Sequence, residues 1–316
     1  MSQSGKGIAL KLSSVIVFTL MAALIKATSD AAPPGEQVFF RSFFAIPVIV
    51  IWLAIRRELR QGVGTRQPMK HFYRGFIGTS AMALNFAALG YLPFPEATAI
   101  GYAAPLLTVI FAAMFLGEDV RAFRLISVLV GLIGVVIVLL PRFGVDSAHL
   151  TTAQTLGAVL ALSGASCSAL AQIFIRKLVQ EERTVVIVFW FSITSSLLAL
   201  TTLPFGWVVP TGWTLVMMIA TGLLGGIGQI LLTSAYRHAD ASLVAPFEYA
   251  SILLALVIGY VGFNEAPTLT MLTGSAIVVA AGIAIIWRER QLGIRHARQR
   301  KAMTPQGWRH SKPKAT

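Results

Sequence analysis

Long apolar stretches recur along the chain, separated by short polar or proline-containing pieces. Ten of them reach the length of about 20 residues that a helix needs to cross a bilayer. They begin near residues 8, 37, 74, 95, 124, 155, 184, 213, 242 and 267. The pieces between them carry helix breakers, such as Pro33-Pro34-Gly35 and Pro93-Phe94-Pro95, and none has the length of a soluble domain. The pattern predicts an all-α membrane protein with ten transmembrane helices.

The composition agrees with this prediction. Apolar residues make up 56% of the 316 residues and charged residues 12%, whereas soluble domains have about 45–50% and about 25%. The mean hydropathy is +0.74 over the whole length, which excludes a water-soluble fold. The single cysteine, Cys167, has no partner for an internal disulfide.

The positive charges predict an orientation. Of the 26 lysines and arginines, 23 fall at the ends of the stretches that share a side with both termini, and basic residues mark the cytoplasmic side. Both termini are therefore expected in the cytoplasm. A cleaved signal peptide is the alternative for the first stretch, but no convincing small-residue cleavage site follows it. The basic segment 289–316 is expected to be disordered and to rest on anionic lipid; nothing beside it resembles a nucleic-acid-binding module.

An internal repeat is visible when the sequence is shifted by 147 residues. The shift pairs Gly78 with Gly225, Ala88 with Ala235, Tyr102 with Tyr249 and Glu118 with Glu265. Each half then holds five helices, and because five is odd the halves face opposite ways. Residues 1–141 and 155–288 are thus predicted to form two inverted five-helix repeats, the architecture of alternating-access carriers with a midplane binding site.

Charged side chains inside apolar stretches cost about 2.5–3.5 kcal/mol at a helix centre, so they are candidates for function. Glu248 is the strongest candidate for substrate binding, because Pro246 frees a carbonyl group close to it; the alternative is a carboxyl that pairs with a neighbouring cation. Arg41 is expected to contact the substrate or a carboxylate, or to reach the membrane interface. The other substrate-binding candidates are three amides and three aromatic residues: Asn85, Gln172, Gln229, Tyr102, Tyr249 and Trp190. Helix packing is the alternative for the amides, and lipid contact for Trp190.

Catalytic signatures are missing from the sequence. The five histidines lie in predicted loops, at span ends or in the tail, so a haem ligand, an intramembrane zinc protease and a serine–histidine site are unsupported. The chain has no phosphate-loop motif for ATP. We therefore expect a secondary transporter without cofactor or metal, and not an enzyme; a membrane-embedded enzyme or assembly factor is the less favoured alternative. Faces of small residues suit internal packing and a homodimer equally.

Several motifs give the sequence a family resemblance. They are Arg41, Arg74-Gly75, Phe115-Leu116-Gly117-Glu118, Pro246-Phe247-Glu248-Tyr249 and Asn264-Glu265-Ala266-Pro267. With these motifs the chain resembles the EamA-type, ten-helix members of the drug/metabolite transporter superfamily over about residues 8–290. The resemblance implies a carrier in a bacterial inner membrane, nearest to riboflavin or S-adenosylmethionine uptake carriers. Uptake of such a vitamin- or cofactor-like compound is expected; export of amino acids, metabolites or drugs is the alternative.

Overall fold

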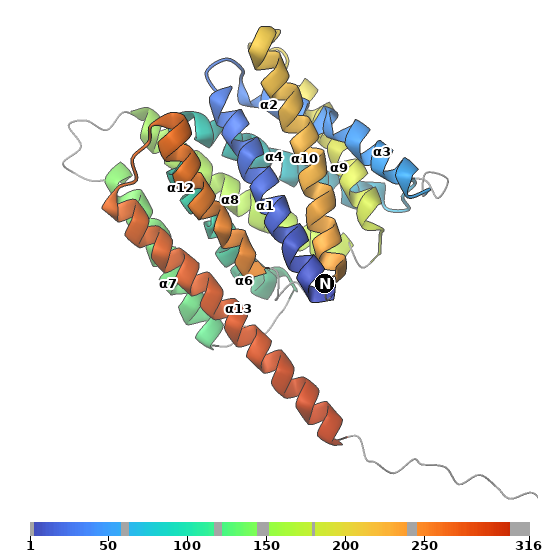
Figure 1. The fold of residues 1–316 in the computed structure, drawn as a ribbon, viewed down its shortest axis with the longest axis vertical. Helices are drawn as coiled ribbons and strands as arrows, with labels where there is room; N and C mark the ends of the chain where they lie inside the picture. The colour runs from blue at the N-terminus through green and yellow to red at the C-terminus, as the bar shows by residue number, and fades with distance from the viewer. Residues whose placement is uncertain are drawn as a thin grey trace, which may run out of the picture.

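The structure, a computed structural model, describes residues 3–57, 63–116, 122–143, 152–178, 181–238 and 245–303. Helices account for the regular structure in these ranges (Figure 1). In chain order they are α1 (Gln3–Ala27), α2 (Pro34–Phe43), α3 (Ala45–Ile55), α4 (Pro68–Tyr91), α5 (Phe94–Gly101), α6 (Ala103–Leu116), α7 (Ala122–Phe143), α8 (Thr152–Leu178), α9 (Thr184–Leu200), α10 (Gly212–His238), the 3₁₀ segment η2 (Ala245–Tyr249), α12 (Ala250–Phe263) and α13 (Leu269–Met303). Glu118 and residues 304–316 lie outside the described residues. Of the basic segment 289–316, which the sequence predicts to be disordered, residues 289–303 continue helix α13 instead.

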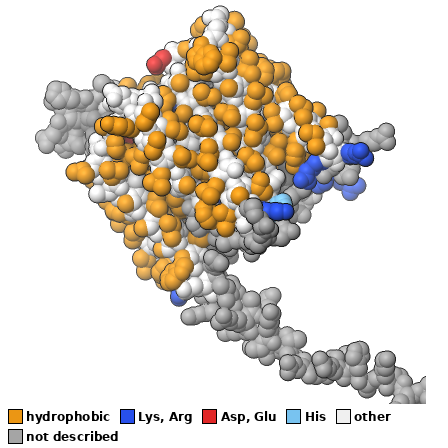
Figure 2. Space-filling model, viewed as in Figure 1, with side chains coloured by type: hydrophobic (Ala, Val, Ile, Leu, Met, Phe, Trp, Pro, Cys, Tyr) orange, Lys and Arg blue, Asp and Glu red, His pale blue; other side chains and the backbone are white. Residues whose placement is uncertain are grey.

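The apolar stretches fold as predicted. In the described part of the chain, six helices are long and apolar enough to cross a membrane: Gly5–Ala27, Pro34–Ile55, Phe94–Phe115, Thr152–Ile175, Gly212–Leu232 and Leu269–Arg288. Three shorter apolar helices are Leu125–Leu140, Val185–Leu200 and Phe247–Phe263. The remaining stretch is α4, whose 24 residues include Lys70 and Arg74. Hydrophobic side chains cover most of the face in Figure 2, as a lipid-exposed surface requires. The predicted all-α, ten-span class is confirmed.

Three of the predicted spans are divided into two helical pieces. One divides at Phe44, between α2 and α3; one at Tyr102, between α5 and α6; and one at Tyr249, between η2 and α12. Pro47 and Pro105 follow the first two divisions by three residues. Each lacks the N–H that would bond four residues back, which weakens the helix at the division. Tyr102 and Tyr249, paired by the repeat, therefore occupy equivalent helix junctions.

The helix pairing has the symmetry of an inverted repeat. α1 packs along α10 and α8 packs along α4, while α2 lies against α9 and α7 against α13 (Figure 1). The repeat equates α1 with α8 and α4 with α10, so it converts the first pair into the second. It maps the α2/α9 and α7/α13 pairs onto themselves. Such exchange is the relation between halves of an inverted-repeat carrier. The exact domain boundaries stay a prediction, because residues 144–151 lie outside the described ranges.

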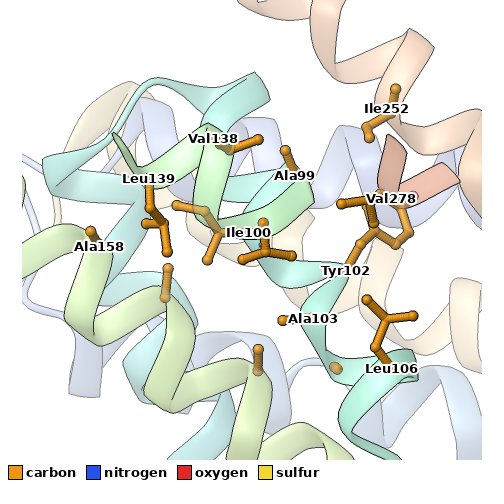
Figure 3. Packing of buried hydrophobic residues seen from close by; sticks show 14 of the residues in the cluster. Ala99, Ile100, Tyr102, Ala103, Leu106, Val138, Leu139, Ala158, Ile252 and Val278 are labelled. Atoms are coloured by element: carbon orange, nitrogen blue, oxygen red, sulfur yellow. The ribbon is translucent and has the colours of Figure 1, made fainter. Parts of the chain in front are cut away.

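Apolar and small residues fill the centre of one side of the molecule. Figure 3 shows Ile100, Tyr102 and Leu106 of the fourth span packed towards Val138 of α7 and Val278 of α13. α7 and α13 approach most closely at two glycines: a Cβ added at Gly274 would lie 2.6 Å from the carbonyl oxygen of Gly134. Only glycine fits there, because the obstructing atom belongs to the backbone.

Gly274→Ala is expected to lower the stability of the α7/α13 pair by about 1–3 kcal/mol, the usual cost of overpacking. Thermal unfolding of the purified protein in detergent measures the loss. Gly262→Ala is the matched control, since the nearest atom to its added Cβ is 3.9 Å away. Equal melting temperatures for the two variants would contradict the close contact.

Candidate functional site

An ion pair joins α1 to the segment that precedes α12. Lys11 Nζ lies 3.3 Å from Glu248 Oε2, and the Lys11 side chain is 2% exposed while that of Glu248 is 52% exposed. The sequence placed Glu248 in a span and left pairing with a cation as the alternative to substrate contact; the structure shows this pairing, and a substrate role stays a prediction. The sequence pattern marks Lys11 only as one of the 23 basic residues that predict the orientation. Its position inside the 23-residue apolar span Gly5–Ala27 is the signal that marks it as a partner.

Tyr102 and Tyr249 meet at the centre of the molecule. Their ring centroids are 5.0 Å apart at an interplanar angle of 38°, so in this conformation the two rings contact each other at a tilt. The Tyr102 hydroxyl donates to the Glu248 carbonyl oxygen over 2.7 Å and shares a hydrogen bond with the Ser251 hydroxyl. Because the carbonyl belongs to a 3₁₀ segment beside Pro246, the tyrosine bonds a group that a regular helix would use internally. Stacking on a planar ligand stays a prediction for both rings.

Two cavities adjoin this region. One, of about 210 Å³, is lined by Lys11, Ser14, Thr98, Glu248 and Ser251 among others. The second, of about 260 Å³, includes Asn85 and Ser168 in its wall and shares Ala22, Phe94 and Thr98 with the first. Taken together they reach the range of about 300–1,000 Å³ typical of ligand pockets. In the residues that the structure describes, no group of three or more histidine, cysteine, aspartate or glutamate side chains is placed to hold a metal ion.

The other sequence candidates are distributed unequally around these cavities. Asn85 faces the second cavity and donates to the Ala81 carbonyl oxygen over 2.8 Å and to Ser168 Oγ over 3.4 Å. Trp190 lies elsewhere: its indole N–H donates to the Val63 carbonyl oxygen over 2.7 Å, and it lines a separate cavity between α4 and α9. Gln172 is exposed on α8 and Gln229 half-buried on α10, and neither lines the two central cavities.

A second ion pair lies at the opposite end of α1. Lys26 Nζ lies 2.9 Å from Glu265 Oε1 and donates to the carbonyl oxygens of Leu92 and Leu89 over 2.7 and 3.3 Å. Glu265 Oε2 in turn accepts the backbone N–H of Phe94 over 2.6 Å. We call this set of bonds the Lys26–Glu265 latch. The latch connects α1 to the α4/α5 junction and to the segment after α12. Lys26 lies about 22 Å along α1 from Lys11, at a rise of 1.5 Å per residue.

Local sequence explains how Glu265 reaches this position. Asn264 ends α12 in the left-handed conformation, with φ 53°, which asparagine adopts more readily than most residues. The turn directs the Glu265 N–H back to the Gly259 carbonyl oxygen over 2.8 Å and leaves its carboxylate free to face α5. In the Asn-Glu motif, the asparagine therefore ends the helix and the glutamate supplies the acid of the ion pair.

Two buried arginines form a separate charged cluster. The guanidinium carbons of Arg41 (α2) and Arg74 (α4) lie 5.6 and 3.6 Å from the ring centroid of Phe191 (α9). Their residues are 5% and 7% exposed. The Nε atoms of both arginines and Nη1 of Arg74 are buried without a hydrogen-bond partner in the described structure. The sequence predicts a role for Arg41, whereas Arg74 belongs only to the motif that carries the family resemblance.

Comparison with known proteins agrees with this architecture. The model of the EamA-like transporter family matches residues 5–140 and 155–288. The pseudopaline exporter of Pseudomonas aeruginosa is 31% identical over 286 residues, covering 88% of this chain and 95% of the exporter. The S-adenosylmethionine uptake transporter of Rickettsia bellii is 28% identical over 256 residues, 81% of this chain and 84% of the transporter.

A solved crystal structure has the same fold. It superposes with a TM-score of 0.66 and 21% sequence identity, covering 91% of this chain and 99% of its own. The family match spans both halves of the chain and nearly all of the described helices. The chain therefore belongs to the EamA-like transporter family, and it is a multi-pass membrane transporter.

Proposed function

We propose that the protein is a secondary carrier that moves a small zwitterionic, cofactor-like metabolite by alternating access through the two central cavities. The Lys11–Glu248 pair carries this proposal, because it puts a cation and an anion in the wall of one cavity. Glu248 is the more exposed partner, so a cationic group of a substrate can replace Lys11 there. Asn85 and the tyrosine pair add polar and aromatic contacts nearby.

S-adenosylmethionine is the preferred test substrate. It carries a sulfonium, an ammonium group, a carboxylate and a planar adenine, which suit the charged and aromatic groups of the site. The similarity to an S-adenosylmethionine uptake transporter supports this choice. Riboflavin, the other compound that the sequence resemblance suggested, remains a second test compound without such support.

Uptake is the proposed direction, and export is the second candidate. The 31% identity to a pseudopaline exporter favours export as much as the rickettsial relatives favour uptake. The cavity chemistry is neutral between the two, since an alternating-access carrier moves its substrate down whichever gradient drives it.

The two ion pairs of α1 supply the alternation. Lys11 pairs just before α12 and Lys26 just after it, so α1 is bound to both ends of one span. The Lys26–Glu265 latch seals one end of the cavities, and release of the latch opens it. With both termini in the cytoplasm of a bacterial inner membrane, as the charge distribution predicts, the sealed end is the outer one. The proposed partners are the substrate and the bilayer, and a homodimer stays a prediction.

Uptake of labelled S-adenosylmethionine and of riboflavin tests this function in a bacterial strain without its own route. We expect saturable uptake of S-adenosylmethionine, reduced at least about tenfold by Glu248→Gln, since that change removes the carboxylate that is proposed to receive the cationic group of the substrate. Glu181→Gln is the matched control, because Glu181 pairs with Lys70 over 2.6 Å at the exposed surface, where the Lys70 hydrogen bond lowers its pKa.

Two results would contradict the proposal. Uptake by Glu248→Gln at the wild-type rate would show that Glu248 does not bind the substrate. Absence of uptake of both compounds, with the protein confirmed in the membrane and tolerance to added metabolites raised, would favour the exporter.

Cysteine labelling tests the latch. Thr98, which lines both cavities, is changed to cysteine after Cys167→Ser removes the only native thiol. A membrane-impermeant thiol reagent is expected to label Thr98→Cys from the Lys11 end alone, and Glu265→Gln is expected to add labelling from the Lys26 end. Glu181→Gln is the control and should leave the labelling unchanged. If Glu265→Gln also leaves it unchanged, the latch does not close the path.

A further inference from the structure

The Arg41–Arg74 cluster has no counter-charge in the described part of the chain. The acids on neighbouring elements are engaged elsewhere. Glu36 of α2 accepts the Val208 N–H over 3.1 Å, Glu182 accepts the Thr65 hydroxyl over 2.6 Å, and Glu181 pairs with Lys70. Two like charges buried in a membrane protein are costly without an anion. The Phe191 ring face attracts both guanidinium groups, but it satisfies none of the N–H groups in their planes.

The cluster lies where the two halves of the protein meet. A shift of 150 residues pairs Arg41 with Phe191, and the shift of 147 pairs Gly78 with Gly225. Each of these two glycines packs against one of the arginines. A Cβ added at Gly225 would lie 3.2 Å from Arg41 Nε, and one added at Gly78 would lie 3.0 Å from Arg74 Nη1. Phe191 is close to the middle of the 17-residue α9. Inverted-repeat carriers bind their substrates at such a position, between the repeats and near the midplane.

We propose that Arg41 and Arg74 form an anion subsite that binds the carboxylate of the transported substrate. The guanidinium group presents a planar fork of N–H donors that matches a carboxylate in two bonds, and the unpartnered Nε and Nη1 atoms are such donors. The proposal rests on the carrier function above and extends it. Glu248 receives the cationic part of a zwitterion, and the arginines receive its acid.

α1 separates the arginines from the central cavities in this conformation. Met21 of α1 stands beside Gly225, with its sulfur 3.3 Å from the Cβ position, next to Arg41. The adjacent Ala22 lines both cavities. A shift of α1 against α10 therefore connects the arginines to the cavities. The latch and the Lys11–Glu248 pair, which fix α1, control this connection.

Melting temperatures of the purified protein in detergent test the subsite without requiring the natural substrate. The probes are benzoate, a carboxylate, and benzamide, its uncharged analogue of nearly the same shape, at constant ionic strength. Benzoate is expected to raise the melting temperature of the wild type by about 2–4 °C through binding to the folded state, and benzamide to leave it unchanged. Arg41→Gln and Arg74→Gln should abolish the response, whereas Arg56→Gln, at an exposed arginine that stacks on Trp52, should keep it.

The melting temperatures without probe separate binding from a structural role. Removing one of two repelling charges is expected to leave Arg41→Gln and Arg74→Gln at least as stable as the wild type. Lower melting temperatures in both would show that the arginines serve packing and would overturn the subsite. If the glutamine variants do not fold, Arg41→Lys and Arg74→Lys replace them. A weaker benzoate response is then expected, and a response as strong as that of the wild type would overturn the two-bond guanidinium contact. An equal response to benzoate and benzamide would overturn the carboxylate assignment.

Transport measurements then distinguish this inference from the carrier function. Arginine-dependent benzoate binding without any uptake would support the subsite and count against the proposed substrate. S-adenosylmethionine uptake that Arg41→Gln and Arg74→Gln leave intact would overturn the subsite and keep the carrier. We expect uptake that both variants abolish. We also expect decarboxylated S-adenosylmethionine, which lacks the acid, to compete with this uptake at least tenfold more weakly than S-adenosylmethionine itself.

Discussion

A lysine within a membrane-spanning helix destabilises the helix in lipid unless an acid neutralises it, and α1 carries Lys11 and Lys26 in addition to Lys6 near its start. Lys11 and Lys26 are neutralised by Glu248 and Glu265, which lie immediately before and immediately after α12. These pairs cross from the first half of the chain to the second. The relative position of the halves, and with it the shape of the cavities between them, depends on these two ion pairs.

The inverted repeat makes this dependence useful for transport. Helix pairs exchange or map onto themselves under the repeat, and the equivalent residues Tyr102 and Tyr249 contact each other at equivalent helix junctions. In the proposed carrier cycle the two halves rock relative to each other. In the proposed cycle, release of the latch opens the Lys26 end of the path, while the Lys11–Glu248 pair keeps α1 attached to the segment before α12.

The sequence predicted those features that depend on local pattern. Apolar stretches of membrane length, the repeat spacing and the isolated carboxylate of Glu248 all follow from residue types along the chain. The pairing of Lys11 with Glu248 could not be predicted, because it joins residues 237 positions apart through the packing of α1. The same holds for Arg74, whose closeness to Arg41 depends on how α2, α4 and α9 meet. Trp190 had the right residue type, but its hydrogen bond to Val63 places it away from the central cavities.

The central claim is that α1 and the end of α12 separate during transport. Nitroxide labels at Ala31→Cys and Ala266→Cys, both exposed near the latch, report this separation by pulsed electron–electron distance measurement after Cys167→Ser. In lipid bilayers we expect a short distance without substrate and a second, longer distance whose population grows with substrate concentration and dominates in Glu265→Gln. A single distance, unchanged by substrate and by Glu265→Gln, would contradict it.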